Sequence, residues 1–252
     1  RHPVPRERIA VGVTHQHTGP VIAGTAPFMF SRDLPADEQA RIDRYAATLE
    51  RKLVEVALEA LANRNPADLS WAQGRASFAV NRRLIVDGKH TGYKATPGGP
   101  VDHALPVLRA VDEQGGVRAV LVNYACHCTT LKGGDNYVHP DWAGEAAKRI
   151  EGANAGAVAL VAIGCGADSD PQPRGLLAVA TNGGAVAEEV ARVMAGDIIA
   201  FSPPLIITEE HSTHPTDWPY EKLIHGFHRD VIPGYRRITD EVHRHGVPIF
   251  AQ

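Results

Sequence analysis

Histidines follow two apolar stretches of the chain, at points where strands would end. His15 and His17 stand in the segment T-H-Q-H-T-G-P, directly after the apolar residues 9–13. His127 follows the apolar run 117–124. Open α/β sheets place their chemistry at the carboxyl ends of strands. These residues are therefore candidates for metal binding or proton transfer, and the structural alternative is a hydrogen-bonded histidine at a strand end.

A histidine pair with one intervening residue suits zinc. His15 and His17 would present both rings on one face of an extended segment, so that one can bind the ion while the other helps the reaction, and His127 could be a second ligand from a neighbouring strand. A catalytic zinc ion polarises a carbonyl group and lowers the pKa of its bound water to about 7. The chain has 13 histidines, so chance spacing is the alternative explanation of the pair.

Two further places carry polar residues after predicted strands. Asp168 and Asp170 follow the apolar run 157–164, which indicates the wall of a site, with an Asx-type turn as the alternative. Arg82 closes the predicted strand 69–80. A basic doublet such as this is commonly solvated, and a substrate-facing arginine is the functional interpretation.

Composition narrows the class of protein. The 252 residues are 44% hydrophobic and 22% charged, as expected for one or two globular domains. A net charge of −3 argues against nucleic acid or an anionic membrane as the main partner. No apolar run approaches the roughly 20 residues of a membrane helix, and the first residues lack a signal peptide. We therefore expect a cytoplasmic protein, whose natural N-terminus is missing because no initiator methionine is present.

The cysteine count argues against a disulfide scaffold, because three is an odd number. Cys126 and Cys128 flank His127, and their spacing leaves a zinc site through both thiols as an alternative. We interpret them as free thiols in a reducing compartment.

Hydrophobic periodicity predicts a layered α/β fold. Helices are predicted at 35–62, 142–150 and 182–194. The first is interpreted as scaffold, and Asp141 is the predicted N-cap of the second. Strands are expected at 9–13, 69–80 and 157–164, and a hairpin joins 105–112 to 117–124 around Glu113-Gln114-Gly115-Gly116. The Gly- and Pro-rich residues 84–106 are expected to form a long loop.

Five motifs, in order over about residues 9–195, resemble those of neutral ceramidases and their bacterial relatives. T-H-Q-H-T-G-P resembles T-H-T-H-S-G-P, and N-R-R at 81–83 resembles the family's N-R segment. N-Y-A-C-H-C-T-T-L resembles a small residue-His-Pro-Thr segment. H-P-D-W-A-G is similar to S-x-D-x-x-G, and G-C-G-A-D-S-D-P-Q resembles a G-D-x-S/N-P loop.

The resemblance implies a zinc-dependent amidohydrolase that cleaves an N-acyl amide such as ceramide, in sphingolipid metabolism. His15 and His127 match two zinc ligands, and His17 matches a histidine near the catalytic centre. Arg82 matches a substrate-contacting arginine, and Asp170 stands where ceramidases place a serine. The family's other ligands, a glutamate and a tyrosine, have no matching segment here, so we expect weak zinc binding and impaired activity. The implied partner is a small-molecule or lipid amide.

The chain changes character near residue 204. Residues 205–252 resemble part of the Old Yellow Enzyme-like, FMN-dependent reductases, as a β-α-β fragment of a TIM barrel in which Gln252 matches a glutamine near the flavin. So small a part of a barrel cannot close around a flavin. We therefore expect a composite chain: a ceramidase-like domain at 1–203 and a barrel fragment at 204–252. An FMN-dependent oxidoreductase fragment and an inactive composite are the alternatives, and the oligomeric state stays open.

Overall fold

The computed structural model describes residues 4, 9, 11–24, 34–131, 138–196, 199–200, 206–207, 211–212, 224–225, 229–244 and 249–250. In chain order the elements up to residue 200 are α1 (Ala36–Ala62), β1 (Ala67–Arg75), β2 (Ala79–Asn81), β3 (Arg83–Val86), β4 (Lys89–Tyr93), β5 (Ala104–Asp112), β6 (Val117–Tyr124), α2 (Asp141–Ala153), β7 (Val158–Ile163), β8 (Ser169–Pro171), α3 (Leu176–Ala195) and β9 (Ile199–Ala200). The rest are β10 (Ile206–Ile207), β11 (His211–Ser212), β12 (Ile224–His225), the 3₁₀ helix η2 (Arg229–Val231), α4 (Ile232–Arg244) and β13 (Ile249–Phe250).

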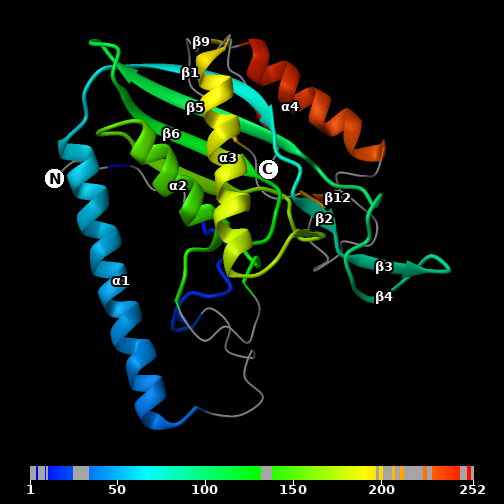
Figure 1. Cartoon of the computed structure of the whole chain (residues 1–252). Coiled ribbons are helices and arrows are strands. Elements are labelled where there is room, and N and C mark those ends of the chain that lie inside the picture. The colour runs from blue at the N-terminus through cyan, green and yellow to red at the C-terminus, as the bar shows by residue number, and fades with distance from the viewer. Residues whose placement is uncertain are drawn as a thin grey trace.

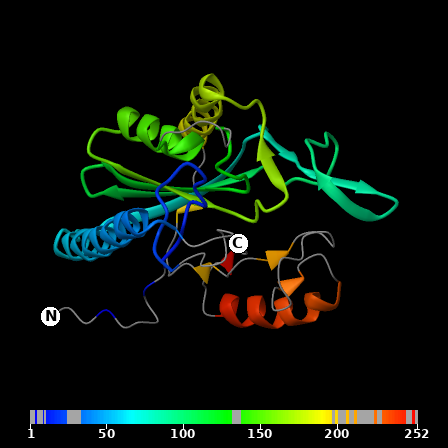
Figure 2. The ribbon, with the colours of Figure 1, turned by 90° about the horizontal axis from the view of Figure 1, so that it is seen from below.

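A five-stranded mixed sheet, in the order β7-β6-β5-β1-β9, forms the centre of the molecule. β6 pairs with β7 in parallel, and the other neighbouring strands are antiparallel. Helices α2 and α3 cover one face of this sheet, as Figures 1 and 2 show. The arrangement confirms the predicted α/β fold class.

The core lies between this sheet face and the two helices. Burial alternates along β6, where Val120, Val122 and Tyr124 face the helices. The helices contribute the side chains that pack against the strands, namely Trp142, Ala146, Ile150, Val186, Val190 and Val193. Because alternate side chains of a strand face the same side, the period-two pattern of β6 orients the residues that follow it, including His127.

The hairpin predicted from Glu113-Gln114-Gly115-Gly116 is confirmed: β5 pairs with β6 around this turn. The Asp112 carboxylate accepts hydrogen bonds from the backbone N–H groups of Gln114 and Gly116. Gly115 has a φ of 84°, which a residue without a side chain adopts readily.

Two predicted strands differ in the structure. Residues 9–13 were expected to form a strand, but residues 9 and 11–13, which the structure describes, belong to none. Val11 and Val13 are 80% and 75% exposed, so these apolar side chains do not pack against a sheet. The strand expected at 69–80 is divided: β1 ends at Arg75, and β2 leaves the main sheet to pair with β8.

The loop expected at 84–106 contains a hairpin instead. β3 and β4 pair antiparallel around Asp87 and Gly88, which both have positive φ values of 50° and 75°. Asp-Gly favours tight hairpin turns, and it forms one here within a segment rich in Gly and Pro. The hairpin projects from the molecule in Figure 1.

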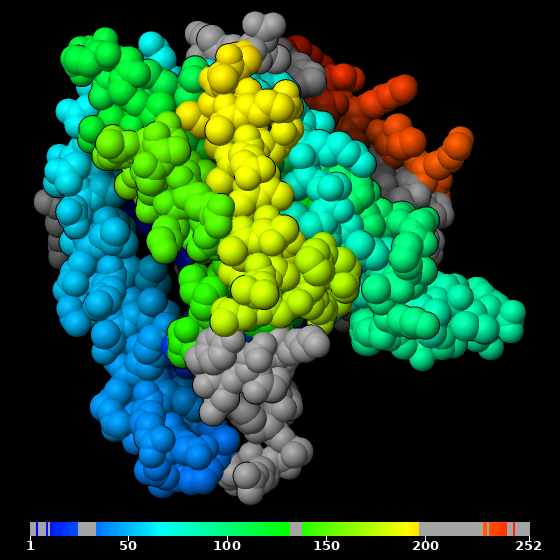
Figure 3. All heavy atoms as spheres, in the orientation of Figure 1, coloured from blue at the N-terminus to red at the C-terminus, as the bar shows by residue number. Residues whose placement is uncertain are grey.

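The predicted helices are present, with corrections. All of α1 lies within the described residues and none of its side chains is buried, so it does not brace the core as expected. In Figure 3 it runs along the opposite side of the molecule from the β3–β4 hairpin. α3 begins at Leu176, earlier than predicted. Asp141 is not the N-cap of α2: Pro140 precedes the helix, and Asp141 is its first residue.

Toward the C-terminus, β10 and β13 pair in parallel, with α4 between them in sequence. This connectivity is the predicted β-α-β arrangement. α4 lies on the side of the sheet opposite α2 and α3 (Figure 2). Gln252 lies outside the described residues. Among the residues described, no helix combines the length and apolar character needed to cross a bilayer.

Candidate metal centre

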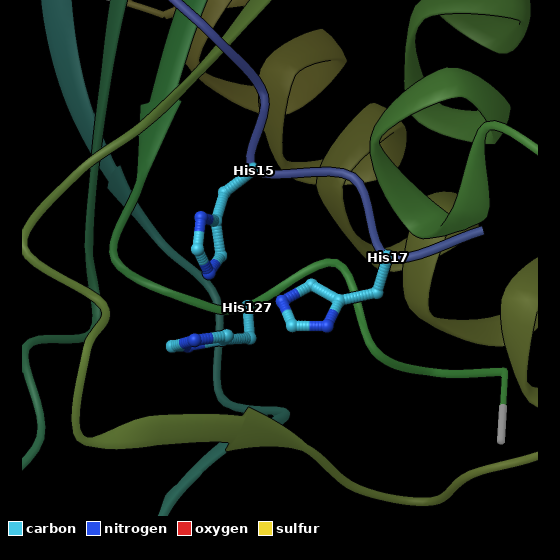
Figure 4. Close-up of side chains that lie close together, drawn as sticks. All are labelled: His15, His17 and His127. Atoms are coloured by element: carbon cyan, nitrogen blue, oxygen red, sulfur yellow. The ribbon is translucent and has the colours of Figure 1, made fainter. Parts of the chain in front are cut away.

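The structure brings His15, His17 and His127 together. The ring centroid of His15 lies 4.7 Å from that of His17 and 4.6 Å from that of His127, and the remaining pair is 5.5 Å apart. Potential ligand atoms of all three residues lie within 4.8 Å of one another. In Figure 4 the three rings point toward one another, two from the N-terminal segment and one from the loop after β6.

The N-terminal segment reaches this place without forming a strand. Gln16 makes a single parallel bridge to Cys128, the residue after His127. The side chains of Gln16 and Thr18 both donate to the backbone oxygen of His139. The backbone oxygen of Thr18 in turn accepts from the backbone N–H of His139. His15 has a φ of 48°, so the segment is bent rather than extended. The bend, not strand periodicity, turns both rings to one side.

His127 is fixed by hydrogen bonds to the loop after β7, to β8 and to α2. Its backbone N–H donates to the oxygen of Ser169 at 3.0 Å, and its backbone oxygen accepts from the Trp142 indole at 2.9 Å. Its Nδ1 lies 2.6 Å from the backbone oxygen of Gly166. A carbonyl oxygen only accepts, so Nδ1 carries the proton and Nε2 presents its lone pair.

The surroundings favour the neutral forms of His17 and His127. Burial, aided by the neighbouring Arg82 guanidinium, lowers the pKa of His127 to about 4. Partial desolvation, as the His17 ring lies against the other histidines, also lowers the pKa of His17, and the nearby His15 and Arg82 act in the same direction. Neutral imidazole is the form that binds metal. Three histidines with one ring oriented through Nδ1–H to a carbonyl oxygen are a donor set that fits zinc.

Arg82 lies directly beside the cluster. Its Nη2 is 3.1 Å from Nε2 of His127, and its Nε donates to the backbone oxygen of Ala167 at 3.0 Å. Its Nη1 is 3.4 Å from Oδ1 of Asp170. The guanidinium also lies over the Tyr93 ring, 5.0 Å from the centroid. Arg82 is thus held between the β3–β4 hairpin and the loop after β7.

The two acidic candidates take different positions. Asp168 is 4% exposed and accepts hydrogen bonds from the Asn81 side chain and the Ser169 hydroxyl. Asp170 is more accessible, and its carboxylate contacts Arg82, Thr129 and Arg174. Neither belongs to the metal-capable group among the described residues.

Arg174 and Thr129 were not predicted from the sequence. Nη2 of Arg174 lies 2.5 Å from Oδ2 of Asp170, and the Thr129 hydroxyl donates to Oδ1 at 3.0 Å. The spacing of four residues between Asp170 and Arg174 predicts no contact, because the segment between them is not helical. Thr129 lies two residues after His127, so its proximity to the site follows from that of the histidine.

All three cysteines are free thiols, and two of them are buried next to His127. Burial and the Asp141 carboxylate raise the pKa of Cys128 to about 12, and burial also raises that of Cys126. We therefore expect a disulfide reagent such as DTNB to label at most one thiol, Cys165, in the native chain and all three after unfolding in guanidinium chloride.

A Cys165→Ser variant is the control for this labelling, since it should remove the native reaction and leave two thiols that react only after unfolding. Native modification of Cys126 or Cys128, located by peptide mass mapping, would contradict the buried positions of these residues.

The described residues thus form a mixed α/β domain with a cluster of three histidines at one end of the central sheet. No protein-family model matches the sequence, and no curated protein matches it. Among solved structures, a ceramidase complexed with C2 is 18% identical in sequence, with a TM-score of 0.44. The match covers 53% of this chain and 23% of the ceramidase. The neutral ceramidase from Pseudomonas aeruginosa is 19% identical in sequence, with a TM-score of 0.43. This match covers 62% of the present chain and 25% of the ceramidase. The chain therefore spans about a quarter of the length of these structures.

Proposed function

We propose that this chain carries a zinc-dependent hydrolase site that cleaves the amide bond of a small-molecule or lipid N-acyl amide, with ceramide as one candidate substrate. The observation that carries the proposal is the cluster of three histidines whose ligand atoms lie within 4.8 Å of one another. The motif resemblance of the sequence to neutral ceramidases supports the same reaction. The 204–252 segment has no assigned part in it.

In this proposal His15, His17 and His127 hold the ion, one ligand more than the motif resemblance alone implies. A zinc ion bound there would polarise the substrate carbonyl and supply hydroxide at neutral pH. Nη2 of Arg82 lies 3.1 Å from Nε2 of His127, the nitrogen that would bind the ion, so ion binding would displace this contact and leave Nη2 to donate to a substrate oxygen near the ion. Asp170 holds Arg82 through Oδ1. Asp168 acts as a positioning residue, since its buried carboxylate holds the Asn81 side chain.

The test combines metal content with hydrolysis. Purified chain incubated with zinc should retain about one ion per chain by elemental analysis, and it should release fatty acid from a short-chain ceramide or another N-acyl amide. A chelator should stop the release, and added zinc should restore it.

A chain lacking all three histidine side chains (His15→Ala, His17→Ala and His127→Ala) should lose both the ion and the activity. His90→Ala, an exposed histidine on the β3–β4 hairpin, should keep both. Release that a chelator does not affect, or full zinc content in the triple variant, would refute the proposal.

A further inference from the structure

Next to the histidines, one carboxylate lies between two guanidinium groups. Asp170 accepts from Nη1 of Arg82 at 3.4 Å through Oδ1 and from Nη2 of Arg174 at 2.5 Å through Oδ2. The Thr129 hydroxyl also donates to Oδ1. Both carboxylate oxygens are therefore occupied, and Asp170 is not a free nucleophile. Two guanidinium charges and one carboxylate leave this group with a net charge of +1.

Arg174 has hydrogen-bonding capacity that Asp170 does not use. Its Nε–H is buried, and no hydrogen-bond partner for it lies within the residues that the structure describes. The side chain as a whole is 29% exposed, so a solute can reach the outer N–H groups of the guanidinium, although Nε itself is buried. Guanidinium has five N–H donors in a planar fork that matches a carboxylate. An unpaired buried Nε–H is unfavourable, and the accessible N–H groups beside it, of which only Nη2 bonds to described residues, are available to the carboxylate of a ligand.

The backbone on both sides of Arg174 is fixed. The Gly175 N–H donates to the oxygen of Thr130 at 2.7 Å. The buried Asn182 side chain, on α3, donates to the oxygen of Pro173 at 3.1 Å. Asp170 itself lies in β8, which pairs with β2 immediately before Arg82. The two arginines are therefore positioned by separate parts of the fold before any ligand binds, which favours binding.

We propose that Arg82 and Arg174 form an anion-binding subsite beside the histidine cluster, and that it takes the carboxylate of an N-acyl amino acid. The inference rests on the proposed amide-hydrolysing function and deepens it by naming a substrate class. The net charge of +1 favours a singly charged carboxylate over a doubly charged phosphate. Arg82 contacts both His127 and Asp170, so a carboxylate bound here lies next to the place assigned to the scissile amide.

The alternative is that Arg174 only forms a structural ion pair with Asp170. Arg149 provides a comparison, because it pairs with Glu145 at the same four-residue spacing, at 2.7 Å, partly exposed where α2 lies against α3. That pair contains one positive and one negative group and has no second arginine. An Arg149→Gln variant therefore removes a similar ion pair without touching the proposed subsite.

The experiment measures binding of N-hexanoylglycine and its neutral counterpart N-hexanoylglycinamide to the full chain by calorimetry, with and without zinc. Wild-type chain should bind the carboxylate at least about 10-fold more tightly than the neutral amide, as charge-assisted hydrogen bonds do. Arg174→Gln should reduce this ratio to about one, and Arg174→Lys should keep only part of it because lysine lacks the fork. Arg149→Gln should keep the whole ratio. Thermal unfolding shows whether each variant is folded, and the Arg174→Lys result stands if Arg174→Gln does not fold.

An unchanged ratio in Arg174→Gln or Arg174→Lys, or equal binding of the two compounds by wild-type chain, would overturn the subsite. Hydrolysis by wild-type chain is scored separately. If the zinc-loaded chain cleaves the neutral amide without preferring the carboxylate, the proposed function stands and the subsite fails. If the carboxylate binds in an Arg174-dependent manner and neither compound is cleaved, the subsite stands and the hydrolase proposal fails.

Discussion

Replacing His127 by alanine is expected to weaken zinc binding by about 100-fold or more. Removing a residue that merely orients a ligand lowers metal affinity by about 10- to 100-fold, and removing a ligand itself has a larger effect. His127 is the most firmly held of the three candidate ligands, since its backbone N–H, its backbone oxygen and Nδ1 each have a partner. Calorimetric titration of the chelator-treated chain with zinc measures the change.

Loss of structure must be separated from loss of a ligand, because the His127 ring also donates to Gly166. His17→Ala serves this purpose: His17 is exposed, so its removal should lower zinc affinity with little effect on thermal unfolding in a chelator. His90→Ala should change neither quantity. Unaltered zinc affinity in both His17→Ala and His127→Ala would mean that the cluster is not the binding site.

Replacing Asp141 by alanine is expected to destabilise the fold by about 4 kcal/mol. The carboxylate is fully buried and accepts the backbone N–H groups of Thr130, Leu131 and Trp142. Each buried donor left without a partner costs about 1–3 kcal/mol. Asp141 also has a φ of 52°, a conformation that alanine tolerates less well. Urea unfolding monitored by tryptophan fluorescence measures the change.

The matched control is Asp112→Ala, which removes a carboxylate that also accepts backbone N–H groups, in the exposed turn between β5 and β6. This substitution should lower the free energy of unfolding by about 1 kcal/mol, since water replaces the lost acceptor. Asp141→Asn, which keeps one acceptor oxygen and the shape of the side chain, should fall between the two. Equal effects of Asp141→Ala and Asp112→Ala would show that the buried position of Asp141 contributes nothing.

Local patterns predicted the elements that have a clear period. The apolar runs that became β6 and β7 were found because both strands are mostly apolar and lie between turn residues. Asp141 was predicted as the N-cap of α2, whereas it is the first residue of that helix. Its carboxylate binds the loop after His127 as well as Trp142, and such contacts between segments are not visible in local spacing.

The histidine cluster was anticipated by a partly wrong route. His15 and His17 were expected at the end of a strand, whereas a bend and side-chain contacts to His139 bring them to His127. Arg174 was missed because an arginine after two prolines carries no distinctive pattern. The contact of Arg174 with Asp170, and through it with Arg82, depends on the pairing of β2 with β8. That pairing joins distant parts of the chain: Asn81 and Asp168, for example, are hydrogen-bonded although they lie 87 positions apart.

The bridge between Gln16 and Cys128 joins residues 112 positions apart (128 − 16) through a single backbone contact. Bringing such distant residues together lowers the conformational entropy of the chain, by an amount that corresponds to about 4.7 kcal/mol for a permanent link closing a loop of this length. An ion shared by His15 and His127 would act as a removable cross-link at this point. Such an ion binds only when the N-terminal segment is docked against the loop after β6, so it would stabilise the docked state. The affinity for the ion and the stability of the docked segment would then report the same equilibrium.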